Sequence, residues 1–329
     1  MLNRRFLLKG AALVALGTVL DGAARPASAA TPEPLSRQAP GYFRLMVGDI
    51  EVTALYDGGV LSEPKLLHGL TPQEITALLE ASCWKLPDGR YPTSINAFLL
   101  KMESGVVLVD TGAGTYFGDK GGHLVANMRD AGYGAEQIDT VLLTHLHSDH
   151  ALGLVDGAGK ALFPKATVRV HAADAAYWLS PGAEGRVTEG QRKVLPALRT
   201  ALAPYQAAGR FKTFAAGEAP AAGVKAVPLA GHTPGQCGYS VRSGGAGILF
   251  WGDIAHCMAA QFPHPEVSID YDVDQGAAIA TRQALLSRLD REGTWVAGAH
   301  LPFPGIGHVR PAAVGHVWRP ALYAVPTAL

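Results

Sequence analysis

Short apolar runs bounded by Gly, Pro, Asn or Asp recur along the chain and predict β-strands. Residues 96–100 and 106–109 form one predicted pair, and residues 42–56 hold two more strands around the turn Gly48-Asp49. Further runs share one feature, a His or Asp close behind their last apolar residue; they lie at 141–144, 227–230, 248–252 and 294–299.

Helical periodicity appears between these runs. Thr71-Pro72-Gln73-Glu74 is a capping box with Pro at the first helical position, and it predicts a helix through about Ser82. Asp274 is expected to cap a helix at 275–291 that carries an apolar face. Other predicted helices lie at 121–132, 172–180 and 190–208, the last of them interrupted by Pro196 and Pro204. No repeat and no low-complexity linker follows residue 40.

Metal-capable side chains gather in one hexad directly after the run 141–144. His145, His147, Asp149 and His150 offer imidazole and carboxylate ligands, which together suit a cation such as zinc. If the strand continues through this stretch, His145 and His147 share a face and can bind one ion. Asp149 and His150 would then lie in the following turn and face a second ion. A polar loop whose histidines cluster by chance is the alternative.

Three more candidate ligands stand at the ends of later apolar runs. His232 follows the run 227–230, Asp253 ends the run 248–252, and His300 follows 294–299. Any one of them alone would more often be a helix cap or a satisfied buried polar group. Because four buried strands each deliver a ligand at their carboxyl end, we expect one site with two metal ions.

These residues resemble the metallo-β-lactamase superfamily, whose H-x-H-x-D-H motif matches residues 145–150. The resemblance implies an α/β fold, an αββα sandwich of two mixed β-sheets with helices on the outer faces. His147 stands where the di-iron branch has Glu, and Asp253 stands where many β-lactamases have Cys. The resemblance also implies the ligand sets: His145, His147 and His232 on one metal, Asp149, His150 and His300 on the other, and Asp253 bridging.

Longer motifs resemble the methyl parathion hydrolase and aryl-lactonase branch. They lie at 39–44, 48–55 and 300–308, and the similarity runs from about residue 39 to the C-terminus. Metal binding does not explain these motifs, so they bear on the subfamily. The branch implies a homodimer and a small-molecule substrate, either an ester, a lactone or a phosphotriester.

Two divalent cations held together lower the pKa of a shared water and supply a bridging hydroxide for hydrolysis. Zinc is the first expectation, and Mn, Co or Fe accept the same ligands. Asp149 and Asp253 are the predicted catalytic residues, Asp149 as the group that passes a proton to the leaving group. Asp110 is predicted to orient a metal-binding histidine, with a turn Asp that bonds local amides as the alternative. No G-x-S-x-G motif is present.

The substrate pocket is predicted from the resemblance. Phe117 and Trp178 match aromatic pocket positions, with ordinary core packing as the alternative. His256, Ile269 and Tyr271 differ from the small or aliphatic residues of methyl parathion hydrolases. A polar ring near the metals favours a planar lactone or aryl ester over a tetrahedral phosphotriester. We therefore expect a lactonase or arylesterase with promiscuous organophosphate triesterase activity.

Other functions stay open at this point. The chain could be primarily a phosphotriesterase of the methyl parathion type. A β-lactamase or a glyoxalase II-like thioesterase is disfavoured by the Asp253 position and by the lack of a recognisable basic anchor for glutathione. From a different class, a metal-binding protein that has lost catalysis would predict a missing ligand, and all of them are present.

The first 29 residues have the pattern of an export signal. Arg4-Arg5 precede a short apolar stretch, and Ala27-Ser28-Ala29 offers a cleavage site, which is typical of the twin-arginine type. We expect a periplasmic protein with a signal peptide at 1–29, a mobile linker at 30–40 and one hydrolase domain at 41–329. The apolar stretch is too short to span a bilayer comfortably, so no stable membrane insertion is expected after cleavage.

Composition narrows the partners. Lys and Arg number 28 and so do Asp and Glu; without residues 1–29 these become 24 and 27, a net charge of −3. No basic run suggests a nucleic acid partner. The cysteines Cys83, Cys237 and Cys257 allow at most one disulfide. Cys237 and Cys257 are either spare soft ligands or small buried apolar side chains, and we favour the second.

Overall fold

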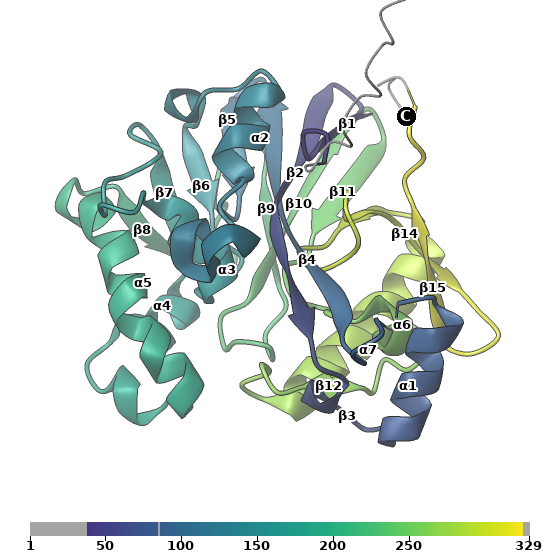
Figure 1. Ribbon diagram of the computed structural model, residues 1–329. Coiled ribbons are helices and arrows are strands. Elements are labelled where there is room, and N and C mark those ends of the chain that lie inside the picture. The colour runs from purple at the N-terminus through teal and green to yellow at the C-terminus, as the bar shows by residue number, and fades with distance from the viewer. Residues whose placement is uncertain (1–37, 85, 325–329) are drawn as a thin grey trace, which may run out of the picture. The chain divides into compact units, whose positions relative to one another are not determined.

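Two mixed β-sheets form the centre of the computed structural model, which describes residues 38–84 and 86–324 (Figure 1). The first has the order β1 (Tyr42–Val47), β2 (Ile50–Ser62), β4 (Tyr91–Met102), β5 (Gly105–Val109), β6 (Thr140–Leu142), β7 (Thr167–His171) and β8 (Phe211–Phe214). The second has the order β15 (His316–Pro320), β14 (Ile306–Pro311), β13 (Trp295–Ala297), β11 (Ala246–Phe250), β10 (Cys237–Ser243) and β9 (Lys225–Pro228). A small ribbon pairs β3 (Leu67–His68) with β12 (Ser268–Ile269).

Helices connect the strands and cover the sheets. The α-helices are α1 (Pro72–Ala81), α2 (Leu124–Asp130), α3 (Ser148–Ala151), α4 (Ala172–Leu179), α5 (Glu189–Ala207), α6 (Met258–Gln261) and α7 (Gln275–Glu292). Single 3₁₀ turns are η1 (Pro64–Leu66), η3 (Ala135–Gln137), η4 (Leu152–Leu154) and η5 (Ala183–Gly185), and η2 (Gly114–Lys120) is longer.

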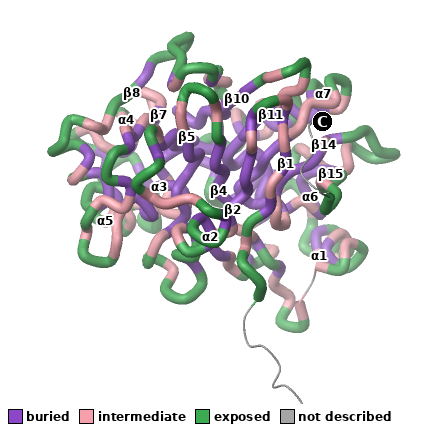
Figure 2. Tube along the Cα trace, turned by 90° about the horizontal axis from the view of Figure 1, so that it is seen from above, coloured by how far each residue is buried: buried purple, intermediate pink, exposed green. Residues whose placement is uncertain are grey.

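The alternation of side chains along β4 creates the layers. Successive strand residues point to opposite faces, so Leu99 packs outward with helix residues such as Leu198, while Phe98 packs inward. The ring of Phe98 meets Phe250 of the second sheet at 5.4 Å between centroids. On the far side of that sheet, Leu249 packs with Leu286 of α7. Burial is greatest along the strands (Figure 2). The expected αββα arrangement is confirmed.

Local signals in the sequence place two helix starts correctly. The side-chain oxygen of Thr71 accepts the Glu74 N–H at 3.2 Å and the Glu74 carboxylate accepts the Thr71 N–H at 2.8 Å, which confirms the capping box of α1. Asp274 accepts the Ala277 N–H at 2.9 Å and caps α7. Each cap satisfies donors that the first helical turn leaves without a partner.

The expected interruption of the helix at 190–208 is wrong. Pro196 and Pro204 both lie inside the continuous α5. Its N-terminus is fixed by a capping box at Thr188, and Leu195 and Leu202 bury one face against the first sheet. This packing outweighs the backbone hydrogen bonds that the prolines remove.

The predicted signal peptide at 1–29 and residues 30–37 of the predicted linker lie outside the described residues. Within 38–84 and 86–324, no helix is long and apolar enough to cross a membrane. Cys83, Cys237 and Cys257 are all free, the last two buried.

Candidate metal centre

The hexad 145–150 lies in a loop and a short helix, not in a strand. β6 ends at Leu142. From Thr144 onward, two backbone N–H groups bond to side chains and not to a neighbouring strand: Thr144 donates to the carboxylate of Asp110 at 2.7 Å, and Leu146 donates to that of Asp174 at 2.7 Å. The strand-face argument for pairing His145 and His147 is therefore wrong. α3 begins at Ser148, so Asp149 and His150 are helical and not in a turn.

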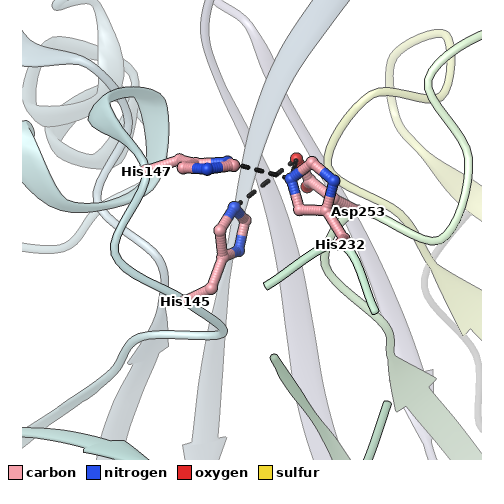
Figure 3. A group of neighbouring side chains, drawn as sticks. All are labelled: His145, His147, His232 and Asp253. Atoms are coloured by element: carbon pink, nitrogen blue, oxygen red, sulfur yellow. Dashed lines mark hydrogen bonds and ion pairs between the residues drawn. The ribbon is translucent and has the colours of Figure 1, made fainter. Parts of the chain in front are cut away.

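The loop nevertheless brings the first group of predicted ligands together. Ligand atoms of His145, His147, His232 and Asp253 all lie within 4.8 Å of one another (Figure 3). Nε2 of His232 is 2.9 Å from Nδ1 of His147 and 3.2 Å from Oδ2 of Asp253. Nε2 of His145 is 3.6 Å from the same oxygen. Segments distant in sequence thus converge on one point.

A second group of predicted ligands lies beside Asp253. Asp149, His150 and His300 also place ligand atoms within 4.8 Å of one another. Oδ1 of Asp253 lies 3.1 Å from Nε2 of His150, and Oδ2 lies 2.9 Å from Nε2 of His300. Because its carboxylate faces both groups, Asp253 stands where a bridging ligand would stand.

The histidine rings are oriented by their second nitrogens. Nδ1 of His150 bonds Asp110 at 2.9 Å, Nδ1 of His232 bonds Asp272 at 2.8 Å, and Nδ1 of His300 bonds a main-chain carbonyl at 2.8 Å. Such partners fix the ring and leave Nε2 pointing at the ion. Asp110 therefore lies where its predicted role requires.

The donor set fits divalent cations. Nε2 of His145 and Nε2 of His147 are buried and lack a hydrogen-bond partner. A folded protein rarely leaves several buried polar atoms without partners unless a ligand serves them. Neutral imidazole and carboxylate are ligands for zinc and similar metals. The fold and the cluster together indicate a dinuclear divalent metal site.

The charges of the cluster compensate one another without metal. Burial disfavours the imidazolium form and lowers the pKa of His145 and His147 well below the usual value. Burial would raise the pKa of Asp253, but the surrounding histidines outweigh it and hold that pKa well below its usual range. The carboxylates of Asp253 and Asp272 outweigh burial at His232 and raise its pKa to about 9. Without metal, the cluster thus holds an ionised Asp253, neutral His145 and His147, and a protonated His232 that must release its proton to bind a metal ion.

Glycines allow two of the ligand loops to approach their neighbours. Gly252 has φ of +61°, and a Cβ there would lie 3.0 Å from the Thr144 side chain. Gly231 has φ of +138°, and a Cβ there would lie 2.3 Å from the backbone of Ala278. Both positions precede a ligand, so a larger residue would displace Asp253 or His232.

Sequence reasoning missed several buried polar residues that hold the ligand loops. Asp174 accepts the Leu146 N–H at 2.7 Å and the Gly235 N–H at 3.3 Å, and so joins the loops of His147 and His232. Asp272 bonds His232, as above, and the guanidinium of Arg282 lies beside Asp272. The only signal for these residues was a charged side chain within a largely apolar stretch.

The predicted pocket aromatics have different surroundings. Trp178 is buried in the core and sets its ring edge-to-face on His147, with centroids 5.2 Å apart. The burial of Trp178 agrees with the core-packing alternative, and its place in a substrate pocket stays a prediction. Phe117 is half-buried in η2 and packs on Tyr116 at 5.3 Å between centroids.

Among the departures from the family pattern, His256 lies within the cluster itself. Its Nε2 is 3.1 Å from Oδ2 of Asp253, and its ring stacks on His300 with centroids 4.6 Å apart. Tyr271 is 43% exposed and its ring centroid lies 5.9 Å from that of His256. Ile269 is fully buried in an apolar cluster with Leu79. His256 and Tyr271 thus border the metal cluster, whereas Ile269 packs in the core.

Comparison with known proteins agrees with this fold and cluster. The model of the metallo-beta-lactamase superfamily matches residues 90–300. The chain belongs to this superfamily, and it is a hydrolase of that family.

The crystal structure of AbOPH, described as a hydrolase in the beta lactamase superfamily, is 37% identical, with a TM-score of 0.84 over 88% of this chain and 100% of that chain. AidC, a dizinc quorum-quenching lactonase in complex with a homoserine product, is 26% identical, with a TM-score of 0.78 over 87% and 99% of the two chains. A probable metal-dependent hydrolase from Staphylococcus aureus is 20% identical, with a TM-score of 0.66 over 84% and 100%, and shares the fold. A search of the curated proteins found no match.

Proposed function

We propose that this protein is a dinuclear metal-dependent hydrolase of lactones or aryl esters, with weaker activity on organophosphate triesters. The observation that carries the proposal is the position of Asp253. Its carboxylate contacts members of both ligand groups: Oδ2 lies beside His145 and His232 of the first group and His300 of the second, and Oδ1 lies beside His150 of the second. This arrangement supports two ions in one site.

Two divalent cations, when bound, lower the pKa of a water molecule and polarise the oxygen under attack. We propose zinc as the metal, because imidazole and carboxylate ligands suit it. Elemental analysis of the purified protein would distinguish zinc from Mn, Co and Fe, which accept the same ligands. The side chain of Asp149 is 20% exposed, against 2% for Asp253. The open position allows Asp149 Oδ2 to pass a proton to the leaving group, while the buried Asp253 holds the two ligand groups together.

The preference for a lactone or aryl ester rests on His256. Burial lowers the pKa of this histidine to about 4, so the ring is neutral at pH 7. Together with Tyr271, whose ring centroid lies 5.9 Å from its own, it places polar groups beside the metal cluster. AidC, a lactonase, offers independent support. We assign the protein to the methyl parathion hydrolase and aryl-lactonase branch on its motifs at 39–44, 48–55 and 300–308.

The test compares kcat/KM of the metal-loaded protein for an aromatic lactone and for methyl parathion. We expect the lactone to be preferred and His256→Leu to shift the ratio toward the phosphotriester. His264→Leu is the matched control, since it makes the same change on the same segment, with its ring bonded to Glu266. It should leave the ratio unchanged.

A tenfold preference of the parent protein for methyl parathion would instead support the alternative, a phosphotriesterase. A metal stoichiometry near zero or one, with no hydrolysis of lactones, aryl esters, phosphotriesters or β-lactams, would support the alternative from the other class, a metal-binding protein without catalysis.

We also propose that residues 1–29 are a twin-arginine export signal and that the mature protein is periplasmic. The pattern Arg4-Arg5 and the site Ala27-Ser28-Ala29 support this. N-terminal sequencing of protein from a periplasmic fraction should begin close to residue 30. Replacing Arg4-Arg5 with two lysines should retain the full precursor in the cytoplasm; export of that variant would contradict the twin-arginine route.

A further inference from the structure

The guanidinium of Arg282 is buried on α7, away from solvent. The residue is 1% exposed, and Nε donates to the carbonyl of Ile254 at 2.6 Å. Nη1 donates to the carbonyls of Val267 at 2.6 Å and Pro265 at 3.1 Å. Burying a guanidinium is costly unless hydrogen bonds and an opposite charge compensate it. The carbonyls supply the hydrogen bonds, and the opposite charge must come from a carboxylate.

That carboxylate belongs to Asp272. Its Oδ2 lies 3.7 Å from Nη2 of Arg282 and accepts the Ile269 N–H at 3.2 Å. Its other oxygen, Oδ1, lies 2.8 Å from Nδ1 of His232. A continuous chain of polar contacts therefore runs from Arg282 on α7 through Asp272 to a ring of the first ligand group.

The same arginine holds the segment that joins Asp253 to Asp272. Ile254, which it bonds, directly follows the bridging-position carboxylate, and Val267 lies shortly before Asp272. Gln261 completes the arrangement, since its amide donates to the Val267 carbonyl at 3.1 Å and its oxygen accepts the His256 N–H at 2.7 Å. Both ends of the segment are thus fixed to one helix.

We propose that Arg282 is a positioning residue for the metal centre: it fixes the carboxylate of Asp272, which in turn orients the ring of His232. The inference rests on the proposed metal site. The guanidinium holds one oxygen of the Asp272 carboxylate while the other oxygen is aimed at Nδ1, so that Nε2 of His232 faces the other ligands. The expected consequence is that Arg282 sets the affinity of the group formed by His145, His147 and His232, although it touches none of these rings.

The experiment uses Arg282→Lys, Asp272→Asn and the double variant. Zn²⁺ affinity is measured by competition with a chromophoric chelator, and the visible spectrum of the Co²⁺-loaded proteins reports ligand geometry. Each single variant should weaken Zn²⁺ binding at one of the two sites by about tenfold or more. It should also shift the absorption bands of bound Co²⁺. The double variant should be no weaker than Asp272→Asn, because Arg282 acts through Asp272.

Arg210→Lys is the matched control. Arg210 also donates to buried main-chain carbonyls, with Nη1 2.6 Å from the oxygen of Ala166, but at the β7–β8 side of the first sheet. It should lower thermal stability without changing Zn²⁺ affinity or the Co²⁺ spectrum. Arg282→Lys that behaves in this way would reduce Arg282 to a structural residue and overturn the inference. Additive losses in the double variant would overturn it too.

If Arg282→Lys does not fold, Asp272→Asn decides, because the inference needs this link. Unchanged Zn²⁺ affinity in Asp272→Asn overturns the inference, and a tenfold loss at unchanged metal-free stability supports it. A parent protein that takes up no metal contradicts the proposed function as well. If the parent binds two ions and Arg282→Lys binds them with the same affinity, only this inference is contradicted and the proposed function stands.

Discussion

Oδ2 of Asp110 lies 2.9 Å from Nδ1 of His150, while Oδ1 of the same carboxylate accepts the Thr144 N–H at 2.7 Å. Asp110 holds a left-handed backbone conformation, with φ of +59°. One carboxylate at the end of β5 therefore fixes both the course of the ligand loop and the orientation of a ligand ring.

Asp110→Asn should weaken metal binding by the group of Asp149, His150 and His300 about 10- to 100-fold. The amide keeps an acceptor for Thr144, but its NH₂ group then faces the Nδ1–H of His150 and favours the wrong tautomer. Chelator competition on the two-site protein measures the effect. Asp139→Asn is the control, because the Asp139 carboxylate accepts the Val106 N–H at 2.9 Å, at the opposite end of β5 from Asp110. Equal affinity in both variants would remove Asp110 from the metal site.

Dialysis against a chelator should abolish hydrolysis and lower the Tm, and Zn²⁺ should restore both. Ligands that bind only the folded state stabilise it by about 2.7 kcal/mol at 100 times Kd. Without metal, the buried Nε2 atoms of His145 and His147 lack a hydrogen-bond partner. Calorimetry before and after removal gives the change. Asp253→Ala should fail to recover activity on adding Zn²⁺; full recovery would contradict its bridging role.

Trp178→Ala should lower the free energy of unfolding by about 3–5 kcal/mol, as expected for a buried aromatic side chain. The ring is 2% exposed and also supports His147 from one side. Phe117→Ala should cost less, since that ring is half-buried in η2. Urea unfolding of metal-free proteins measures both. If Trp178→Ala lowers the free energy of unfolding by less than about 1 kcal/mol, the packing of this ring does not stabilise the core.

The stability of the metal-free protein should depend on pH through Asp174. Burial raises the pKa of this carboxyl from 3.8 to about 6. The folded state holds the proton more tightly than the unfolded state. Protonation of Asp174 therefore adds to the free energy of unfolding, fully below pH 3.8, and this stabilisation is lost as the pH rises through about 6. The shift of roughly two units corresponds to about 3 kcal/mol.

The measurement compares urea unfolding of the parent protein and Asp174→Asn at pH 4 and pH 7. The free energy of unfolding of the parent, relative to that of the variant, should be about 2.4 kcal/mol higher at pH 4 than at pH 7, because at pH 4 the unfolded carboxyl is already partly ionised. Parallel pH profiles of the two proteins would show that Asp174 does not titrate in this range.

Local sequence signals predicted much of the fold. The capping box at Thr71, the cap at Asp274 and the paired strands at 96–100 and 106–109 depend on neighbours in the chain, and each is present in the structure. The predicted interruption at Pro196 and Pro204 was wrong, because the buried face of α5 outweighs the local preference of these prolines. The strand geometry predicted for the hexad was also wrong, because β6 stops before His145.

The sequence by itself determined the types and order of the candidate ligands, since residue chemistry and apolar runs are properties of short stretches. Apart from Asp110, only the tertiary structure decided which side chains hold them. Asp174 lies 28 residues from Leu146, and Asp272 lies 40 residues from His232. Hydrogen bonds across such separations depend on which segments pack together, and no local periodicity records that. Arg282, which reads as one polar residue on a helix, is buried against the metal loops for the same reason.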